Sequence, residues 1–234
     1  MTHFDALETR SADQRAADLA ADLPNQIATA MSAPAMAAHL GEVEPATITD
    51  LAALAALPVL RKSELGAAQK AQPPFGGFTP AAAHRARHVF QSPGPIYEPA
   101  GHGRDWWRIG RFLHAAGIGA DDIVQNCFSY HLTPAGMIFE SGAEAVGATV
   151  VPAGIGQTEL QVQAAHDIGS TAYAGTPDYL KIILDKAAEM GLPLRITKAT
   201  VGGGALFPSL RAEYADRGIA CLQNYATADL GNVA

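Results

Sequence analysis

The second half of the chain alternates short apolar runs with segments in which apolar residues recur at helical spacing. The apolar runs begin roughly every 20 to 28 residues from residue 123 onward. Each run has the length of a buried strand, and Gly, Pro or polar residues separate it from the next helical segment. The runs are Ile123–Phe128, Thr149–Val151, Thr171–Ala174, Ala199–Val201 and Ile219–Leu222. Strand, helix and strand at this spacing predict right-handed crossovers and an α/β fold, with a mostly parallel sheet flanked by helices.

Start and stop signals mark the helices of this region. Ile109, Phe112, Leu113 and Ala116 share one helical face, and Gly117 follows as a predicted C-cap. The sequence also predicts N-caps followed by proline at Thr133-Pro134 and Thr176-Pro177, a capping box between Thr158 and Gln161, and helix ends at Gly191 and Gly218.

The N-terminal part is rich in Ala and Pro and has a weaker pattern. Ser11 and Gln14 have capping-box spacing, so a helix is expected to begin there, and Pro24 is expected to bend or end it. Asp50 is expected to open another short helix.

Pro and Gly are frequent between residues 73 and 103, which are predicted to be loop with one strand near 88–91. We therefore expect an irregular helical and loop region over 1–103, then an α/β nucleotide- or acyl-binding subdomain over 104–234.

Composition excludes several classes of protein. With 48% hydrophobic and 17% charged residues, the chain is large enough to bury a sizeable core. The net charge of −7 and scattered basic residues argue against nucleic-acid binding. No stretch approaches the ~20 apolar residues of a membrane span, and the N-terminus lacks the features of a signal peptide. We expect a cytoplasmic location, no membrane partner, and Cys127 and Cys221 as buried reduced thiols.

In open parallel sheets, ligands bind beyond the carboxyl ends of the strands. The residues directly after the predicted strands are rich in Gly and small polar side chains, which suits a nucleotide or a small acid lying across the sheet. They are Ser129-Tyr130-His131, Pro152-Ala153-Gly154, Gly175-Thr176, Gly202-Gly203-Gly204 and Asn224-Tyr225.

Each candidate also has a purely structural interpretation. The three glycines at 202–204 let a ring or phosphate approach the backbone, or they form a tight turn. Tyr225 stacks on a purine or packs in a core. Asp229 holds a magnesium ion or belongs to the first turn of a helix. His131 lies at the expected ligand edge, although a satisfied structural histidine is the commoner fate of such a residue.

Other motifs are weaker. Gly154 and Gly156 imitate the start of a dinucleotide fingerprint, but Glu159 replaces the third glycine. His84 and His88 have the spacing of helical metal ligands without a third ligand nearby, so a solvated pair is the simpler interpretation. The chain has no G-x-S-x-G elbow and no G-x-x-x-x-G-K-[ST] loop, which disfavours an α/β hydrolase and a P-loop NTPase.

Between about Asp105 and Asp229 the chain resembles the large domain of phenylacetate–CoA ligases, in the adenylate-forming superfamily of acyl-CoA synthetases. More weakly, Phe4–Thr9 resembles the opening of that family. The resemblance depends on motifs occurring in the family's order, and each motif alone is modest. They are Ala115–Val124, Phe128–Gly136, Gly147–Pro152, Gln157–Gln161, Gly175–Leu180, Gly203–Leu206 and Tyr225–Asp229.

The resemblance implies an activity and a set of roles. These ligases adenylate a carboxylic acid with ATP and then transfer the acyl group to coenzyme A, releasing AMP. It implies that Gly203, Gly204 and Ala205 line the adenine and that Tyr225 stacks on it, with Asn224 and Thr227 beside the nucleotide. It also implies that Tyr130 and His131 border the acyl pocket and that Asp229 stands where the family has a magnesium-binding Glu.

Three departures from the family pattern matter. The family's phosphate loop is rich in Ser, Thr and Gly with a Lys, whereas residues 92–99 keep only Ser92 and Gly94 of that character, and Glu98 brings a negative charge. In the Tyr225 motif, Ala228 replaces the usual Ser or Thr. The motif lies close to the last residue, Ala234, so the ribose-binding Asp region, the hinge and the small domain with its catalytic Lys are expected to be absent.

Three hypotheses follow. The first is the N-terminal part of an AMP-forming aryl- or acyl-CoA ligase that uses ATP, Mg and coenzyme A and acts on an aromatic carboxylic acid; the fragment alone is expected to be inactive. The second is a homologue that binds a nucleotide or acyl-CoA without turnover. The third is a Rossmann-like dehydrogenase using Gly154 and Gly156. An apolar surface left by an absent domain would favour a homodimer.

Overall fold

The computed structural model describes residues 3–80, 85–92 and 94–234. His84 and Pro93, which belong to motifs considered above, lie outside these residues. The chain divides into two compact units, Met1–Gly101 and His102–Ala234.

The first unit is mainly helical. It contains the 3₁₀ turns η1 (Ala6–Thr9) and η2 (Pro45–Thr47) and the helices α1 (Ala12–Met31), α2 (Pro34–Leu40), α3 (Leu51–Ala55) and α4 (Lys62–Ala71). The capping box is confirmed: Ser11 Oγ accepts a hydrogen bond from the Gln14 amide (3.1 Å), and Gln14 Oε1 accepts one from the Ser11 amide (2.9 Å). Asp50 caps α3 as expected.

Of the two alternatives expected for Pro24, bending or ending the helix, the second is wrong, because α1 continues to Met31. The residues on both sides of Pro24 are anchored: Leu23 and Ile27 are buried, and Ile27 packs with Leu40 and Ile48. This packing of the apolar stripe outweighs the backbone hydrogen bond that a proline removes.

A hairpin follows where mostly loop was expected. Strands β1 (His88–Ser92) and β2 (Ile96–Ala100) pair antiparallel, with His88 opposite Ala100 and Ser92 opposite Ile96. Gln69 of α4 attaches to β2, since its side chain exchanges two 2.8 Å hydrogen bonds with the backbone of Tyr97. The expected strand therefore has a partner that its Pro-rich sequence concealed.

The second unit contains the predicted parallel sheet, and the α/β class is confirmed. Its five strands lie in the order β4-β3-β5-β6-β7, and all neighbouring pairs are parallel. The strands are β3 (Ile123–Asn126), β4 (Thr149–Val151), β5 (Ala172–Gly175), β6 (Lys198–Val201) and β7 (Ala220–Gln223). Each falls within one or two residues of a predicted apolar run.

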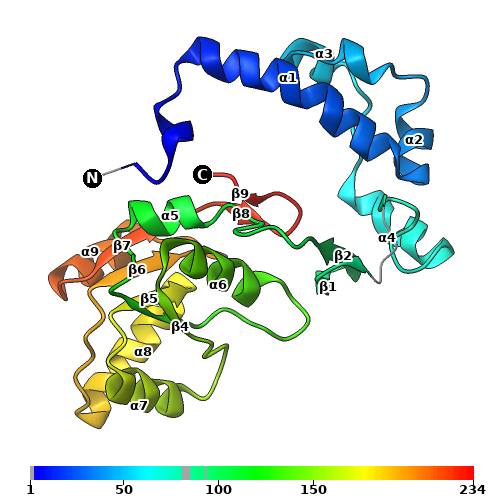
Figure 1. Cartoon of the computed structure of the whole chain (residues 1–234). Coiled ribbons are helices and arrows are strands. Elements are labelled where there is room, and N and C mark those ends of the chain that lie inside the picture. The colour runs from blue at the N-terminus through cyan, green and yellow to red at the C-terminus, as the bar shows by residue number, and fades with distance from the viewer. Residues whose placement is uncertain (1–2, 81–84, 93) are drawn as a thin grey trace. The chain divides into compact units, whose positions relative to one another are not determined.

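Helices cover both faces of this sheet (Figure 1). Helices α5 and α6 pack together on one face, and α7 and α8 pack together on the other. Their bounds, with α9, are α5 (Gly110–Ala115), α6 (Ala135–Val146), α7 (Thr158–Ile168), α8 (Pro177–Met190) and α9 (Pro208–Asp216). The main core joins Tyr173 of β5, Leu180 of α8 and Tyr214 of α9, all fully buried.

Two predicted helix starts are wrong. Thr133 does not cap α6, because the helix begins one residue later with Pro134 in the cap position. The capping box at Thr158 does not form, because Thr158 is already inside α7 and the side chain of Gln161 turns away to a neighbouring loop. By contrast, Thr176 and Pro177 occupy the predicted cap and first positions of α8, and Gly191 is its C-cap.

The last residues form a hairpin of β8 (Ala226–Thr227) and β9 (Gly231–Asn232) after β7. Cys127 and Cys221 are buried free thiols, as expected. Burial raises the pKa of Cys127 to about 12 and that of Cys221 to about 11. Among the residues that the structure describes, no helix combines the length and apolar character needed to cross a bilayer.

Candidate functional site

The strand order fixes where a ligand is expected. From β3 the chain goes first to β4 on one side and then returns to β5 on the other, so the order of strands reverses between β3 and β5. At such a switch point the following loops separate, and a crevice opens at the carboxyl ends of the strands. Phe128 follows β3 and Thr176 follows β5 at this crevice.

The glycine loop, residues 202–205, lies beside this switch point. A Cβ atom on Gly203 would be 3.8 Å from Thr176 and 3.9 Å from Phe128. Gly203, Gly204 and Ala205 are exposed, so their backbone is open to a ligand. The structure thus brings the candidate adenine-lining residues to the edge where a ligand is expected.

Gln223, the last residue of β7, holds the glycine loop in place. Its Nε2 donates to the carbonyl of Gly204 at 2.9 Å, and its Oε1 accepts from the amide of Leu206 at 3.1 Å. The loop is thereby tied at two points to the neighbouring strand.

Asn224 and Tyr225 have opposite environments. Asn224 is buried, its amide donates to the carbonyl of Val201 (3.0 Å), and its Nδ2 donates to Oδ1 of Asn232 (3.0 Å). Tyr225 is 65% exposed, which leaves its ring available to stack on a planar ligand. Tyr225 lies two residues beyond the end of β7 and exchanges backbone hydrogen bonds with Val233 and Ala234.

Asp229 lies in the turn of the β8–β9 hairpin and is exposed, which differs from the helix turn considered as its structural alternative. The hydroxyl of Thr227 accepts a hydrogen bond from the amide of Leu230 (3.0 Å), so Thr227 shapes this turn. Within the described ranges no three His, Cys, Asp or Glu residues gather as a metal site. A single carboxylate is still compatible with magnesium, which is usually held by one or two carboxylates together with substrate phosphates.

Tyr130 and His131 follow β3 on the α6 side of the crevice. The Tyr130 hydroxyl accepts a hydrogen bond from Asn126 Nδ2 (2.7 Å), and its ring covers Gly136, where a Cβ atom would be 2.7 Å away. Burial and the neighbouring Glu140 raise the pKa of Tyr130, so its hydroxyl stays protonated. His131 is exposed, and its backbone amide donates to Ser129 Oγ (3.2 Å).

The loop of Gly154 and Gly156 does not resemble a dinucleotide site. It follows β4, which is an edge strand, and not a strand at the switch point. Both glycine carbonyls accept hydrogen bonds from Nε2 of Gln161, at 2.9 and 2.8 Å, and Tyr179 also donates to Gly156. These hydrogen bonds occupy both glycine carbonyls and hold the loop against α7 and α8, which disfavours the dehydrogenase hypothesis.

The segment at residues 92–99, which the resemblance aligns with a phosphate loop, belongs to the first unit. Ser92 ends β1, and Gly94 and Pro95 form the hairpin turn. Ser92 Oγ donates to Glu98 Oε1 at 2.7 Å, and Lys62 Nζ forms an ion pair with the same oxygen at 2.8 Å. Lys62 therefore compensates the negative charge of Glu98 that the sequence placed in this segment.

Three amide side chains organise the loops at this edge, and the sequence singled out only one of them, Gln161, as part of a capping box. Asn126 bonds Tyr130 and the carbonyl of Gly136, Gln161 bonds the loop after β4, and Gln223 bonds the glycine loop. Their partners are local in space, but the side chains have no sequence signature.

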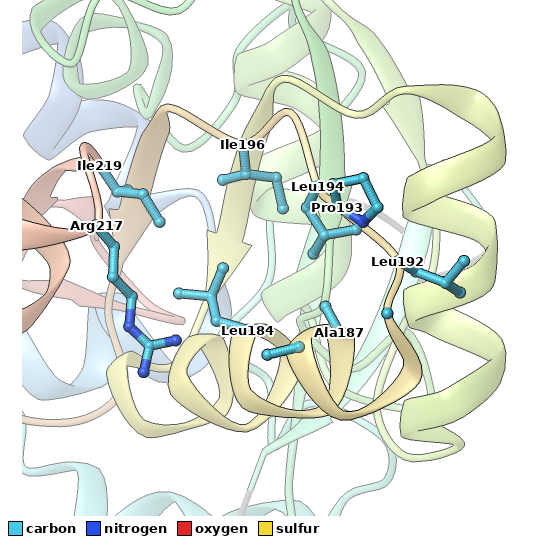
Figure 2. A pocket seen from close by; sticks show the side chains of 10 residues that line it. Leu184, Ala187, Leu192, Pro193, Leu194, Ile196, Arg217 and Ile219 are labelled. Carbon is cyan, nitrogen blue, oxygen red and sulfur yellow. The ribbon is translucent and has the colours of Figure 1, made fainter.

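The apolar groove of about 350 Å³ in Figure 2 lies at the opposite end of the sheet. Leu184 and Ala187 of α8 form one wall, and Ile196 and Ile219, which precede β6 and β7, form another, with Arg217 at the rim. Arg217 is already paired with Asp185 and Glu213 at 2.6 Å. None of the candidate site residues lines this groove.

Comparison with known proteins identifies relatives of the chain. No protein-family model matches it. It is 34% identical over 167 residues to a phenylacetate–coenzyme A ligase of Aromatoleum evansii, which covers 68% of this chain and 37% of that protein. A phenylacetate–coenzyme A ligase of Thermus thermophilus is 29% identical over 157 residues, which cover 64% of this chain and 34% of that protein.

Among solved structures, an open conformation of 2-hydroxyisobutyryl-CoA ligase, in complex with 2-HIB-AMP and CoA, matches with a TM-score of 0.83 at 23% identity. The match covers 94% of this chain and 51% of that chain. The same ligase in the postadenylation state with R3-HIB-AMP gives a TM-score of 0.84 at 24% identity.

The fold is therefore that of an adenylate-forming coenzyme A ligase. More particularly, the chain is a homologue of the phenylacetate–coenzyme A ligases. It spans about a third of the length of these curated relatives and about half of the solved ligase.

Proposed function

We propose that this chain is part of an AMP-forming ligase that joins a carboxylic acid to coenzyme A, converting ATP to AMP and pyrophosphate. The observation that carries the proposal is the exposed glycine loop at the switch point, in a homologue of phenylacetate–coenzyme A ligases. Backbone without side chains beside Thr176 and Phe128 offers a flat surface for an adenine ring. Tyr225 supplies an exposed aromatic ring two residues after the neighbouring strand.

The residues of this chain contribute binding and positioning. Gly203, Gly204 and Ala205 line the adenine, Tyr225 stacks on it, and Asn224 and Thr227 fix the backbone that carries Tyr225 and Asp229. Asp229 would hold Mg beside the phosphates, where the ion neutralises charge as pyrophosphate leaves. Holding acid and ATP in line lowers the barrier without covalent attack by the protein.

We assign the acyl pocket to the side of β3 that faces α6. Phe128 stacks on Phe139 of α6, with ring centroids 4.2 Å apart, and Tyr130 and His131 lie in the following loop. Aromatic walls of this kind suit an aromatic acid. The Tyr130 hydroxyl is held between Asn126 and Glu140, so its ring is fixed at the border of this pocket.

The test uses the protein as its gene encodes it. Acid-dependent exchange of pyrophosphate into ATP is measured across phenylacetate, benzoate and 2-hydroxyisobutyrate, followed by AMP release on addition of coenzyme A. Exchange with one acid supports the proposal, and Tyr225→Ala serves as the variant that should weaken it. Absence of exchange with every acid, in a folded protein, would refute adenylation.

A second candidate function is nucleotide or acyl-CoA binding without turnover. The hairpin at Ser92 favours it, because the Ser92 hydroxyl is bonded to Glu98 and Pro95 offers no amide for a phosphate. This second function predicts that the protein binds AMP but does not exchange pyrophosphate into ATP. Pro95→Gly combined with Glu98→Lys should then raise ATP affinity, and unchanged affinity would show that this hairpin is not a phosphate loop.

Two further properties belong to the same proposal. We place the protein in the cytoplasm, where ATP and coenzyme A are available. We also infer a homodimer, because Phe207, Leu222 and Leu230 are exposed apolar side chains. Sedimentation at micromolar concentration tests it, and a monomer at all concentrations would exclude it.

A further inference from the structure

The β8–β9 hairpin, which carries Thr227 and Asp229, is fastened to the segment that leads into α5. The amide of Asn232 donates to the carbonyl of Trp107 at 2.8 Å. The guanidinium of Arg108 donates to the carbonyl of Leu230. Two consecutive residues of one segment thus bind two residues of the hairpin.

Gly231 lies between these two contacts, against the backbone of Trp107. A Cβ atom on Gly231 would be 2.4 Å from the carbonyl oxygen of Trp107 and 2.8 Å from its Cα. Both atoms belong to the backbone, so no side-chain rotation relieves the overlap. Gly231 also has a φ of +73°, which disfavours any other residue.

The segment itself is held firmly. The carboxylate of Asp105 accepts hydrogen bonds from the amides of Ile109 (2.9 Å) and Gly110 (3.0 Å) at the start of α5. Trp107 is only 7% exposed. Arg108 has a φ of +58°, uncommon for a residue other than glycine, as expected where neighbouring contacts determine the backbone. A side chain at position 231 would therefore move the hairpin and not the segment.

The glycine loop on the adenine side has supports separate from this segment, whereas Asn224 and Tyr225 also bond to residues 232–234 at the end of the hairpin. Gln223 holds the glycine loop, and the amide of Asn224 bonds the carbonyl of Val201 in β6. Neither contact involves Trp107 or Arg108. Displacement of the hairpin should accordingly affect the residues near the phosphates more than those near the adenine.

We propose that Gly231, fitted against the Trp107–Arg108 segment, is a positioning residue that sets Thr227 and Asp229 against the phosphates and magnesium of a bound nucleotide. This inference rests on the proposed nucleotide site. It assigns to Gly231 a role that differs from those of the residues in contact with the ligand.

The test compares Gly231→Ala with Gly218→Ala. Gly218 has nearly the same φ, +76°, but nothing within 4 Å of its Cβ position. The control therefore carries the same backbone cost without the overlap. Binding of MgATP and of adenosine to the protein as its gene encodes it is measured by calorimetry.

We expect Gly231→Ala to weaken MgATP binding about tenfold or more relative to Gly218→Ala, since charge-assisted contacts of this kind are lost. Adenosine affinity should fall by a smaller factor, because the glycine loop keeps its own supports while Tyr225 is bonded to residues 233 and 234. Equal MgATP affinity in the two variants, or an equal loss of adenosine and MgATP, would overturn the inference.

A second measurement does not depend on nucleotide binding. Hydrogen exchange of the Asn232 amide, which donates to the carbonyl of Trp107, should be faster in Gly231→Ala than in Gly218→Ala. If Gly231→Ala fails to fold, Arg108→Gln, which removes one fastening contact without overlap, should show the same preference for losing MgATP over adenosine. A wild-type protein that binds neither ligand would refute the proposed function, and unchanged exchange of the Asn232 amide would refute the fastening itself.

Discussion

A charged cluster at the amino ends of the strands is expected to stabilise the second unit. Asp122 precedes β3, and its side chain is 7% exposed. Its carboxylate accepts hydrogen bonds from Lys198 Nζ (2.8 and 3.0 Å), Thr171 Oγ1 (2.9 Å) and the Gly119 amide (2.9 Å). These partners tie β3 to β5 and β6. Asp122→Asn keeps the shape but removes the charge that orients the cluster.

Removing one partner of a fully buried ion pair costs about 3–5 kcal/mol. Lys198 is 33% exposed, so water compensates part of the loss, and we expect Asp122→Asn to lower the free energy of unfolding by about 2–3 kcal/mol. For a chain of this size that corresponds to a fall in Tm of about 4–12 °C. Asp185→Asn is the matched control, because Asp185 is also paired but its side chain is 47% exposed. Asp185→Asn should lower the free energy of unfolding by much less than Asp122→Asn does.

The effect should depend on pH with a defined sign. Burial alone would raise the pKa of Asp122, but the Lys198 ammonium, the Gly119 amide and the Thr171 hydroxyl together bring it below its usual value. A lowered pKa in the folded state stabilises the protein above the unfolded-state value of about 3.9, and this contribution is lost as the pH falls through the folded-state value. Urea unfolding of both proteins at pH 7, 5 and 3 tests this. Equal free energies of unfolding for the two proteins at pH 7, or a difference between them that grows below pH 4, would refute this reasoning.

Three further predictions concern the carboxyl ends of the strands. Gln161→Leu removes both hydrogen bonds to the Gly154–Gly156 loop and should lower the free energy of unfolding by about 2 kcal/mol. Hydrogen exchange in that loop should become faster, and unchanged exchange would show that Gln161 does not hold the loop. Gly202→Ala places a Cβ atom 2.5 Å from Asn224 Oδ1 and should weaken AMP binding, which calorimetry measures. Undiminished AMP affinity would show that the position of Asn224 does not affect nucleotide binding. Tyr225→Ala should cost about 1–3 kcal/mol of AMP binding if the ring stacks on adenine, while Tyr225→Phe should bind normally; equal losses in both would argue against stacking.

The sheet was predictable from the sequence because its central strands β3, β5 and β6 are largely buried on both faces. Such strands appear as continuous apolar runs, and the βαβ spacing then determines that they are parallel. Tyr173, with β5 buried on both sides, illustrates this. The β1–β2 and β8–β9 hairpins were not predictable in the same way, since each is short and has only one neighbouring strand. Pro24 does not end α1, because the packing of Ile27 outweighs the local preference of proline.

Residues at the site were located better than the contacts that hold them. Gly203 and Tyr225 stood out because of their type and their place after a strand. Gln161 was noticed only as part of a capping box that does not form. Its bonds to Gly154 and Gly156 depend on where two loop carbonyls lie in space, and no pattern of types or spacings encodes that position.

The two ends of the sheet are therefore held by different chemistry, and this has a consequence for binding. At the amino ends, Asp122 and Lys198 contribute through charge, so their contribution changes with acidity. At the carboxyl ends, Asn126, Gln161 and Gln223 hold the loops through amide groups that do not titrate. Acid should then reduce the stability of the fold before it changes the geometry of the loops. AMP affinity, corrected for the protonation of the nucleotide and for the folded fraction, should accordingly stay constant between pH 5 and 8. A decline over that range would mean that a titrating group contributes to the nucleotide site after all.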